Sequence, residues 1–262
     1  MWRDWCDKFF RILTDQEQEV EVNSIRSVCI FIAGLFFITN GYASETLLNH
    51  VKTTSQAMSA FYMQSLSEGN EKYLLEFEKY KKKSFDILKQ YQNEKGERSN
   101  EFMRRWLALN DRLVLTLDKE YGWEVDGSVR QEFRTYLSDI FQMVDNKKNE
   151  YTSKEAKRLL SVVQLEAISA RFFDISSLFN VKVSIFSSDK NKLNPETINT
   201  DFKNNLDTLA NMSGNEKAKR TLASVKSKWE FVEDSVVNYE GHGAYFVVYA
   251  TKNKIQRSLV SL

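Results

Sequence analysis

A serine and an arginine lie within the apolar face of a long helical pattern and are the residues best suited to bind a ligand. Ser169 and Arg171 belong to residues 155–180, EAKRLLSVVQLEAISARFFDISSLFN, a stretch without Pro or Gly. An arginine offers a planar set of N–H donors that fits a carboxylate or an oxyanion. The alternative is a surface ion pair of Arg171 with Glu166 or Asp174, worth roughly 0.3 kcal/mol.

The remaining aromatic and titratable candidates point to structure more than to chemistry. Trp106 and Trp229 each stand at the centre of an amphipathic pattern, so we expect both in the core. Trp229 is also a candidate for stacking against a ligand. His50 and His242 lack metal-ligand spacing, and we expect them to be exposed or to cap helices. No phosphate loop, nucleophile elbow or HExxH motif occurs. The sequence therefore indicates no catalytic residue, no metal and no cofactor.

The composition favours an all-α protein. The 262 residues include 37 basic and 36 acidic ones, and this balance gives no reason to expect a nucleic-acid partner. One Pro and nine Gly leave few turns for a many-stranded β protein. Both cysteines, Cys6 and Cys29, lie near the N-terminus, which excludes thiolate sites further along the chain.

Residues 1–43 are interpreted as a head followed by a signal peptide or a membrane anchor. The apolar run over residues 28–39, VCIFIAGLFFIT, fits the core of a secretory signal and ends in a pattern typical of cleavage after Ala43. Residues 1–21 are amphipathic and then acidic, unlike the basic start of a signal. Either the true start lies near Val22, or the head is cytoplasmic and the run is an uncleaved inner-membrane anchor. Both interpretations predict export to the periplasm.

Beyond residue 44 the apolar side chains recur every three or four positions, as in amphipathic helices. Residues 121–127, YGWEVDG, are expected to form a loop. Residues 181–190, VKVSIFSSDK, alternate like a strand, but we expect a loop extension because nothing nearby could pair with them. The expected helices cover residues 45–66, 71–92, 99–117, 129–144, 155–180, 195–214, 216–239 and a last segment containing Tyr245 and Ile255.

The predicted fold is two antiparallel four-helix bundles in tandem, over residues 44–150 and 151–262. Residues 146–154 between them are polar but contain no Gly or Pro. The fourth helix therefore either continues into the fifth as one long helix shared by the bundles, or ends in a loop.

The two bundles also repeat an order of aromatic residues, which indicates an internal duplication. The segment FMRRWLALNDRLVL around Trp106 parallels VKSKWEFVEDSVV around Trp229. The helix with Phe133 and Tyr136 parallels the last helix, and EFEKYKKKSFDIL parallels DFKNNLDTL.

The second copy, over residues 160–258, resembles the PilJ-like sensing domain of type IV pilus chemotaxis transducers, which is related to NarX-type nitrate sensors. AISARF resembles the family's first-helix motif of the type M-L-S-Q-R-M and keeps Ser169 and Arg171. DFKNNLDTLANM resembles its second helix, and VKSKWEFVEDSVVNY and AYFVVYATKNKI resemble the last two. Glu166 stands nearest to the place of a further family arginine, which argues against a nitrate-type site.

The resemblance implies an exported, non-enzymatic, sensor-like module that binds a small ligand or docks on a membrane receptor or transducer. The alternative is a structural or accessory assembly protein of a pilus or secretion apparatus. A binding module predicts a partly polar pocket near Arg171, whereas a scaffold predicts an exposed apolar patch of more than a few hundred Å². An enzyme would need convergent titratable groups in one cleft. The sequence leaves a homodimer open.

Overall fold

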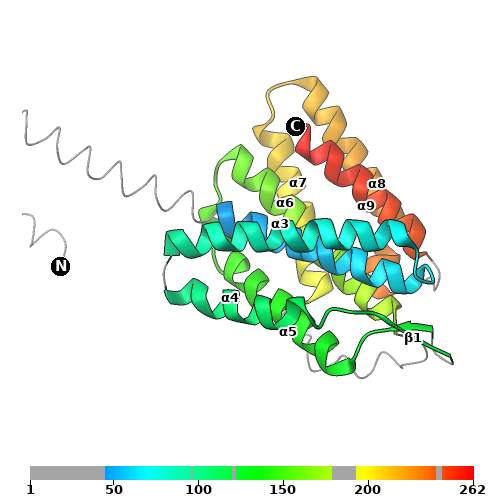
Figure 1. Cartoon of the computed structure of the whole chain (residues 1–262). Helices are drawn as coiled ribbons and strands as arrows, with labels where there is room; N and C mark the ends of the chain where they lie inside the picture. The colour runs from blue at the N-terminus through cyan, green and yellow to red at the C-terminus, as the bar shows by residue number, and fades with distance from the viewer. Residues whose placement is uncertain (1–44, 96, 120–121, 179–192, 240–243) are drawn as a thin grey trace, which may run out of the picture. The chain divides into compact units, whose positions relative to one another are not determined.

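The apolar periodicity produces helices in nearly all the predicted places. The computed structural model describes residues 45–95, 97–119, 122–178, 193–239 and 244–262. The all-α fold class is confirmed (Figure 1). The first described helix covers residues 45–66, and it is followed by α3 (Glu71–Lys95), α4 (Glu97–Asn110), α5 (Gly127–Asp145), the 3-10 turn η1 (Lys148–Glu150), α6 (Lys154–Ser176), α7 (Pro195–Met212), α8 (Glu216–Asn238) and α9 (Tyr245–Val260).

Side-chain caps explain where the later helices begin. The Asn194 side chain accepts a hydrogen bond from the backbone N–H of Thr197, and Pro195 occupies the first helical position of α7. Asn215 caps α8 in the same way. These caps satisfy backbone donors that have no partner within the helix. The predicted start of a helix at residue 195 is confirmed.

The four helices of the second half, residues 154–260, pack against one another in sequence order. α6 contacts α7 and α9, and α8 contacts α7 and α9 (Figure 1). In the first half, residues 45–145, α4 contacts both α3 and α5. Residues Ala43–Leu262 form one compact unit, with a continuous cluster of buried apolar side chains from both halves. The division into tandem bundles at residue 150 stays a prediction.

α5 and α6 are two separate helices, so the version of the prediction in which both bundles share one long helix is wrong. α5 ends at Asp145, and the chain then makes the η1 turn before α6 begins. Two features define the break. Tyr151 has a non-helical backbone conformation and is buried, and the Ser153 hydroxyl caps α6 by accepting a hydrogen bond from the Ala156 N–H. Serine competes with helix continuation in this way when it stands at an N-cap.

Residues 111–126 differ from the prediction, because α4 ends at Asn110 and a small hairpin follows. Strand β1 (Thr116–Asp118) pairs antiparallel with β2 (Gly122–Glu124). The Ser65 hydroxyl donates to the carbonyl of Trp123 at 2.6 Å. The Trp123 ring covers Gly69, whose φ of 83° suits glycine and where an added Cβ would lie 2.5 Å from the indole. This anchorage allows a two-stranded sheet that is marginal in isolation.

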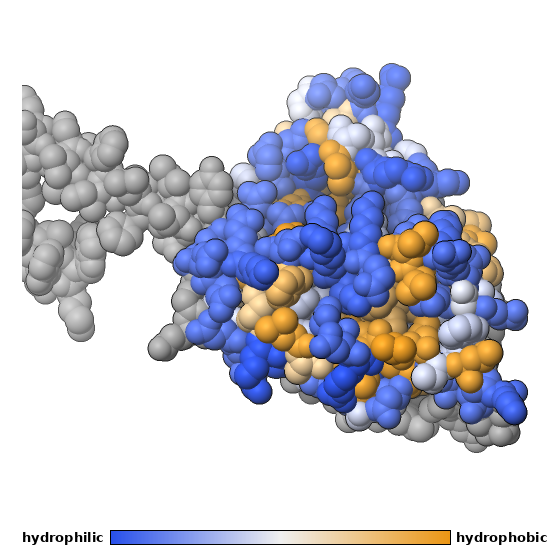
Figure 2. Space-filling view, viewed as in Figure 1, coloured by the Kyte–Doolittle hydropathy of each residue, from blue (hydrophilic) through white to orange (hydrophobic). Residues whose placement is uncertain are grey.

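The signal or anchor predicted over residues 1–43 and the alternating segment 181–190 lie outside the described residues, and so does His242. Within the described part of the chain, none of the helices is both long enough and apolar enough to cross a bilayer. The visible face is mostly hydrophilic, with smaller hydrophobic areas between the hydrophilic residues (Figure 2).

Candidate ligand site on helix α6

Helix α6 is buried on all sides rather than on one face as the sequence suggested. Every residue from Leu160 to Ile175 is buried. The cause is its position: α6 contacts α5, α7, α8 and α9, and Glu166 accepts a long hydrogen bond of 3.4 Å from Gln56 of the first helix. Polar side chains of α6 must therefore find partners inside the protein, because burying them without hydrogen bonds is costly.

Glu166, expected on a solvated helix face, forms a buried ion pair instead. Its carboxylate accepts from the Lys252 ammonium of α9 at 2.6 Å, and both side chains are almost completely buried. Glu166, at the middle of α6, is thus paired with Lys252, which is 86 positions away in the sequence. The predicted surface pairing of Glu166 with Arg171 is therefore wrong.

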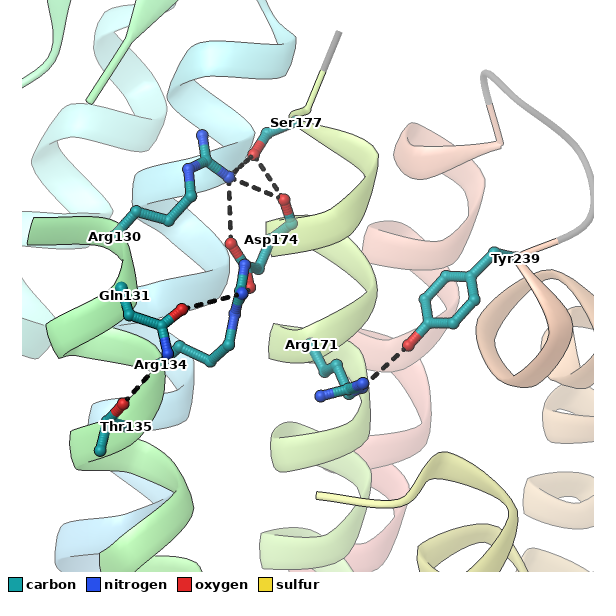
Figure 3. A network of polar contacts seen from close by, with 8 residues as sticks. All are labelled: Arg130, Gln131, Arg134, Thr135, Arg171, Asp174, Ser177 and Tyr239. Atoms are coloured by element: carbon teal, nitrogen blue, oxygen red, sulfur yellow. Dashed lines mark hydrogen bonds and ion pairs between the residues drawn. The ribbon is translucent and has the colours of Figure 1, made fainter. Parts of the chain in front are cut away.

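Asp174, the second predicted partner of Arg171, also pairs with other residues (Figure 3). Its carboxylate accepts from Arg130 Nη1 at 3.0 Å and from Arg134 Nε at 2.6 Å, both on α5. Arg130 Nη1 also donates to the Ser177 hydroxyl at 2.8 Å. Burial raises the pKa of the nearby Tyr62 hydroxyl well above its usual value, and the Asp174 charge adds to this. We name Arg130, Arg134, Asp174 and Ser177 the Asp174 cluster.

Arg171 is left with a neutral partner. Its Nε donates to the hydroxyl of Tyr239 at 3.1 Å, and Tyr239 reaches it from the end of α8 (Figure 3). Only 6% of the Arg171 surface is exposed. Among the described residues no carboxylate pairs with it, and its two Nη groups have no hydrogen-bond acceptor. A buried guanidinium normally has an anionic partner, so this arrangement can accept an anion.

The other two predicted site residues do not join Arg171. Ser169 is fully buried and its hydroxyl has no hydrogen-bond partner among the described residues, but side chains two positions apart on a helix point to different sides. Trp229 is buried in the core, where its Nε1 donates to Asn199 Oδ1 at 2.8 Å and its ring contacts Phe202. Trp229 also lies roughly 15 Å along α8 from Tyr239.

Sequence reasoning missed Tyr239, Arg130 and Arg134. The two arginines stand four positions apart beside Phe133 and Leu137, which places them next to a buried stripe, and this signal could have been recognised. Tyr239 has a weaker signal, since it is an aromatic residue just after a helix where glycine is usual.

His50 contradicts its predicted place on the surface, because it is fully buried. Its Nδ1 donates to the Ser84 carbonyl at 3.1 Å, and its Nε2 lies 2.7 Å from the Tyr136 hydroxyl. A carbonyl only accepts, so the neutral ring carries its proton on Nδ1. Burial lowers the pKa of His50 to about 4. These neutral contacts suit a structural role within the first half.

The described residues contain no group of three or more His, Cys, Asp or Glu side chains placed to hold a metal ion. A shallow depression of about 450 Å³ lies at the start of α8, and its lining does not include Arg171, Ser169 or Trp229. It is lined by Glu216, Lys217, Arg220, Thr221, Ser224 and Ser258.

Comparisons of the chain with protein-family models, with curated proteins and with solved structures each found no match. The PilJ-like resemblance therefore stays a prediction that depends on the sequence motifs alone.

Proposed function

We propose that this protein is an exported, non-enzymatic, sensor-like helical module that binds a small anionic ligand at Arg171. One observation carries the proposal: Arg171 is buried, and both carboxylates that could have neutralised it locally are engaged elsewhere. A carboxylate or oxyanion supplied by a ligand would give the guanidinium the charged, bidentate partner that it lacks among the described residues.

Three further features support this proposal over an enzyme. The nearby charges are balanced by side-chain partners, as in the Asp174 cluster. Arg171 cannot act as a general acid or base, because a guanidinium keeps its proton. The motif AISARF, which carries Arg171, is one of the segments that resemble a sensing domain.

The proposal is tested by thermal unfolding of the full chain with sodium acetate, succinate, citrate, phosphate or nitrate at matched ionic strength. A ligand present at 100 times its Kd stabilises the folded state by about 2.7 kcal/mol. At least one anion is expected to raise the Tm by roughly 5–11 °C, given about 2–4 °C per kcal/mol for a protein of this size.

Two variants with the same change of charge separate the site from general salt effects. Arg171→Gln should abolish the shift. Arg104→Gln should keep it, because Arg104 is exposed on α4 and pairs only locally with Glu101. An equal response of the wild type and Arg171→Gln to every anion would refute binding at Arg171.

The alternative function, an envelope assembly protein, would require apolar side chains at the surface. Phe231 is 73% exposed, Leu117 65% and Leu75 64%. These three lie on different elements, α8, β1 and α3, and single exposed apolar residues are common on monomers. Hydrogen exchange would be compared between the isolated protein and purified envelope complexes. Slower exchange of the segments that carry these residues in the complexes would favour assembly over ligand binding.

A further inference from the structure

Tyr239 has an unusual backbone geometry for an aromatic residue. It ends α8 with φ 57° and ψ 26°, in the left-handed region that glycine or asparagine normally occupies at this position. Such strain costs free energy and persists only where surrounding contacts hold the residue in place. The position of its side chain is therefore specified by more than helix termination.

Two contacts hold the Tyr239 side chain. Its ring lies parallel to that of Phe172, with centroids 6.5 Å apart and planes at 6°. Its hydroxyl oxygen accepts from Arg171 Nε at 3.1 Å (Figure 3). Phe172 and Arg171 are neighbours on α6, so one short stretch of this helix fixes both the ring and the hydroxyl.

The hydroxyl of Tyr239 retains a donor. A phenol can accept one hydrogen bond and donate another. Its oxygen accepts from Arg171, but its own proton has no acceptor among the described residues. Burial raises the pKa of Tyr239, with the Asp174 charge adding to this and Arg171 opposing it, so the proton stays on the oxygen at neutral pH. The phenol proton and the Arg171 Nη groups are thus adjacent donors that lack described acceptors.

We propose that Tyr239 is a second ligand-contacting residue, which donates its phenolic proton to a carboxylate held by Arg171 and so selects carboxylates over halides. The inference rests on the proposed binding at Arg171 and adds the class of anion and the second contact. A carboxylate has two oxygens with several lone pairs, and it can accept from a guanidinium edge and a phenol together. Chloride lacks this directional, two-atom fit.

The test compares the affinity of the full chain for acetate, succinate and citrate with its affinity for chloride, for the wild type and Tyr239→Phe. The variant keeps the ring on Phe172 and removes only the hydroxyl. Carboxylate affinity should fall about tenfold, as expected for the loss of a hydrogen bond to a charged group. Tyr245→Phe is the matched control and should bind like the wild type, because the Tyr245 hydroxyl makes no hydrogen bond with a described residue.

A second readout needs no variant. Tyrosinate absorbance during an alkaline titration should show one tyrosine whose pKa rises when the carboxylate is bound, since the ligand stabilises the protonated phenol. A structural tyrosine would not respond to the ligand.

The outcomes separate the two proposals. If Arg171→Gln loses the carboxylate response and Tyr239→Phe keeps it in full, the role of Tyr239 is overturned and binding at Arg171 stands. If chloride binds as tightly as the carboxylates, the proposed selectivity is overturned. If the wild type and Arg171→Gln respond alike, the proposed function itself fails, and this inference fails with it.

Discussion

Two regions of the molecule bury polar groups in opposite ways. In one region, which we call the neutral network, His50, Ser84 and Tyr136 form hydrogen bonds between neutral groups. In the other, which we call the charged region, Glu166 and Asp174 of α6 are fully buried and paired with Lys252 of α9 and with Arg130 and Arg134 of α5. Hydrogen-bonded neutral groups are buried at modest cost, whereas buried ions require close partners to offset the loss of hydration.

This difference locates where function can reside. A neutral network is complete once its hydrogen bonds are made, and the His50 network shows this. The charged helix also carries Arg171, whose described partner is a neutral hydroxyl. An anion would complete the pattern that Glu166 and Asp174 follow on the same helix. We therefore expect the charged region to depend on its ion pairs more strongly than the neutral network depends on its hydrogen bonds.

The largest effect is expected at Asp174. Asp174→Asn leaves Arg130 and Arg134 buried without their shared carboxylate, and breaking a buried pair in this way costs about 3–5 kcal/mol. Urea denaturation measures the loss in the free energy of unfolding. The control is Asp139→Asn, since Asp139 pairs with Arg105 where both remain partly exposed, and the expected loss is below about 1 kcal/mol. Equal losses in the two variants would contradict the special role of the Asp174 cluster.

The Glu166–Lys252 pair should behave similarly but allow rescue. Glu166→Gln removes the carboxylate and leaves the Lys252 ammonium buried, with an expected loss of about 3 kcal/mol. The double variant Glu166→Leu/Lys252→Met removes both charges and should be more stable than the single one, because apolar replacements of a buried pair are often neutral. Urea denaturation of both variants checks this. A double variant as unstable as Glu166→Gln would mean that packing, not charge, dominates here.

The neutral network should respond to acid through His50. The folded-state pKa is about 4 and the ordinary value is 6.5, so between these pH values the unfolded chain binds a proton that the folded protein excludes. The contribution of the neutral His50 ring to the free energy of unfolding is complete above pH 6.5 and is lost as pH falls. The free energy of unfolding should decrease by about 2 kcal/mol between pH 6.5 and pH 5. The free energy of unfolding across this range should fall less in His50→Gln. An identical pH dependence in the variant would show that His50 is not the cause.

The sequence predicted the helices and much of the core but few of the polar pairs. Apolar spacing alone located Trp106, Trp229 and Phe133, all of which are buried. Local spacing also suggested Glu166 and Asp174 as partners of Arg171, because residues three to five positions apart were the only ones whose proximity could be judged.

The true partners are distant in sequence. Arg130 is 44 positions from Asp174, and Tyr239 is 68 positions from Arg171. Such pairs depend on how helices pack, which the periodicity of one segment does not specify. The same reason explains why α6 was predicted to have a solvated face: its pattern shows how apolar it is, but not that helices surround it.

The smallest effect distinguishes the two tryptophans that the repeat places in corresponding helices. The Trp229 indole N–H donates to Asn199, whereas the buried Trp106 N–H has no hydrogen-bond acceptor among the described residues. Replacement by phenylalanine removes similar volume from both sites, but it breaks a hydrogen bond only at residue 229 and removes an unsatisfied donor at residue 106. Trp229→Phe should therefore cost about 1 kcal/mol more than Trp106→Phe in urea denaturation. A larger loss for Trp106→Phe would indicate that its contacts with His50 and Tyr136 outweigh the missing acceptor, and that the surroundings of the neutral network depend on aromatic packing more than on hydrogen bonds.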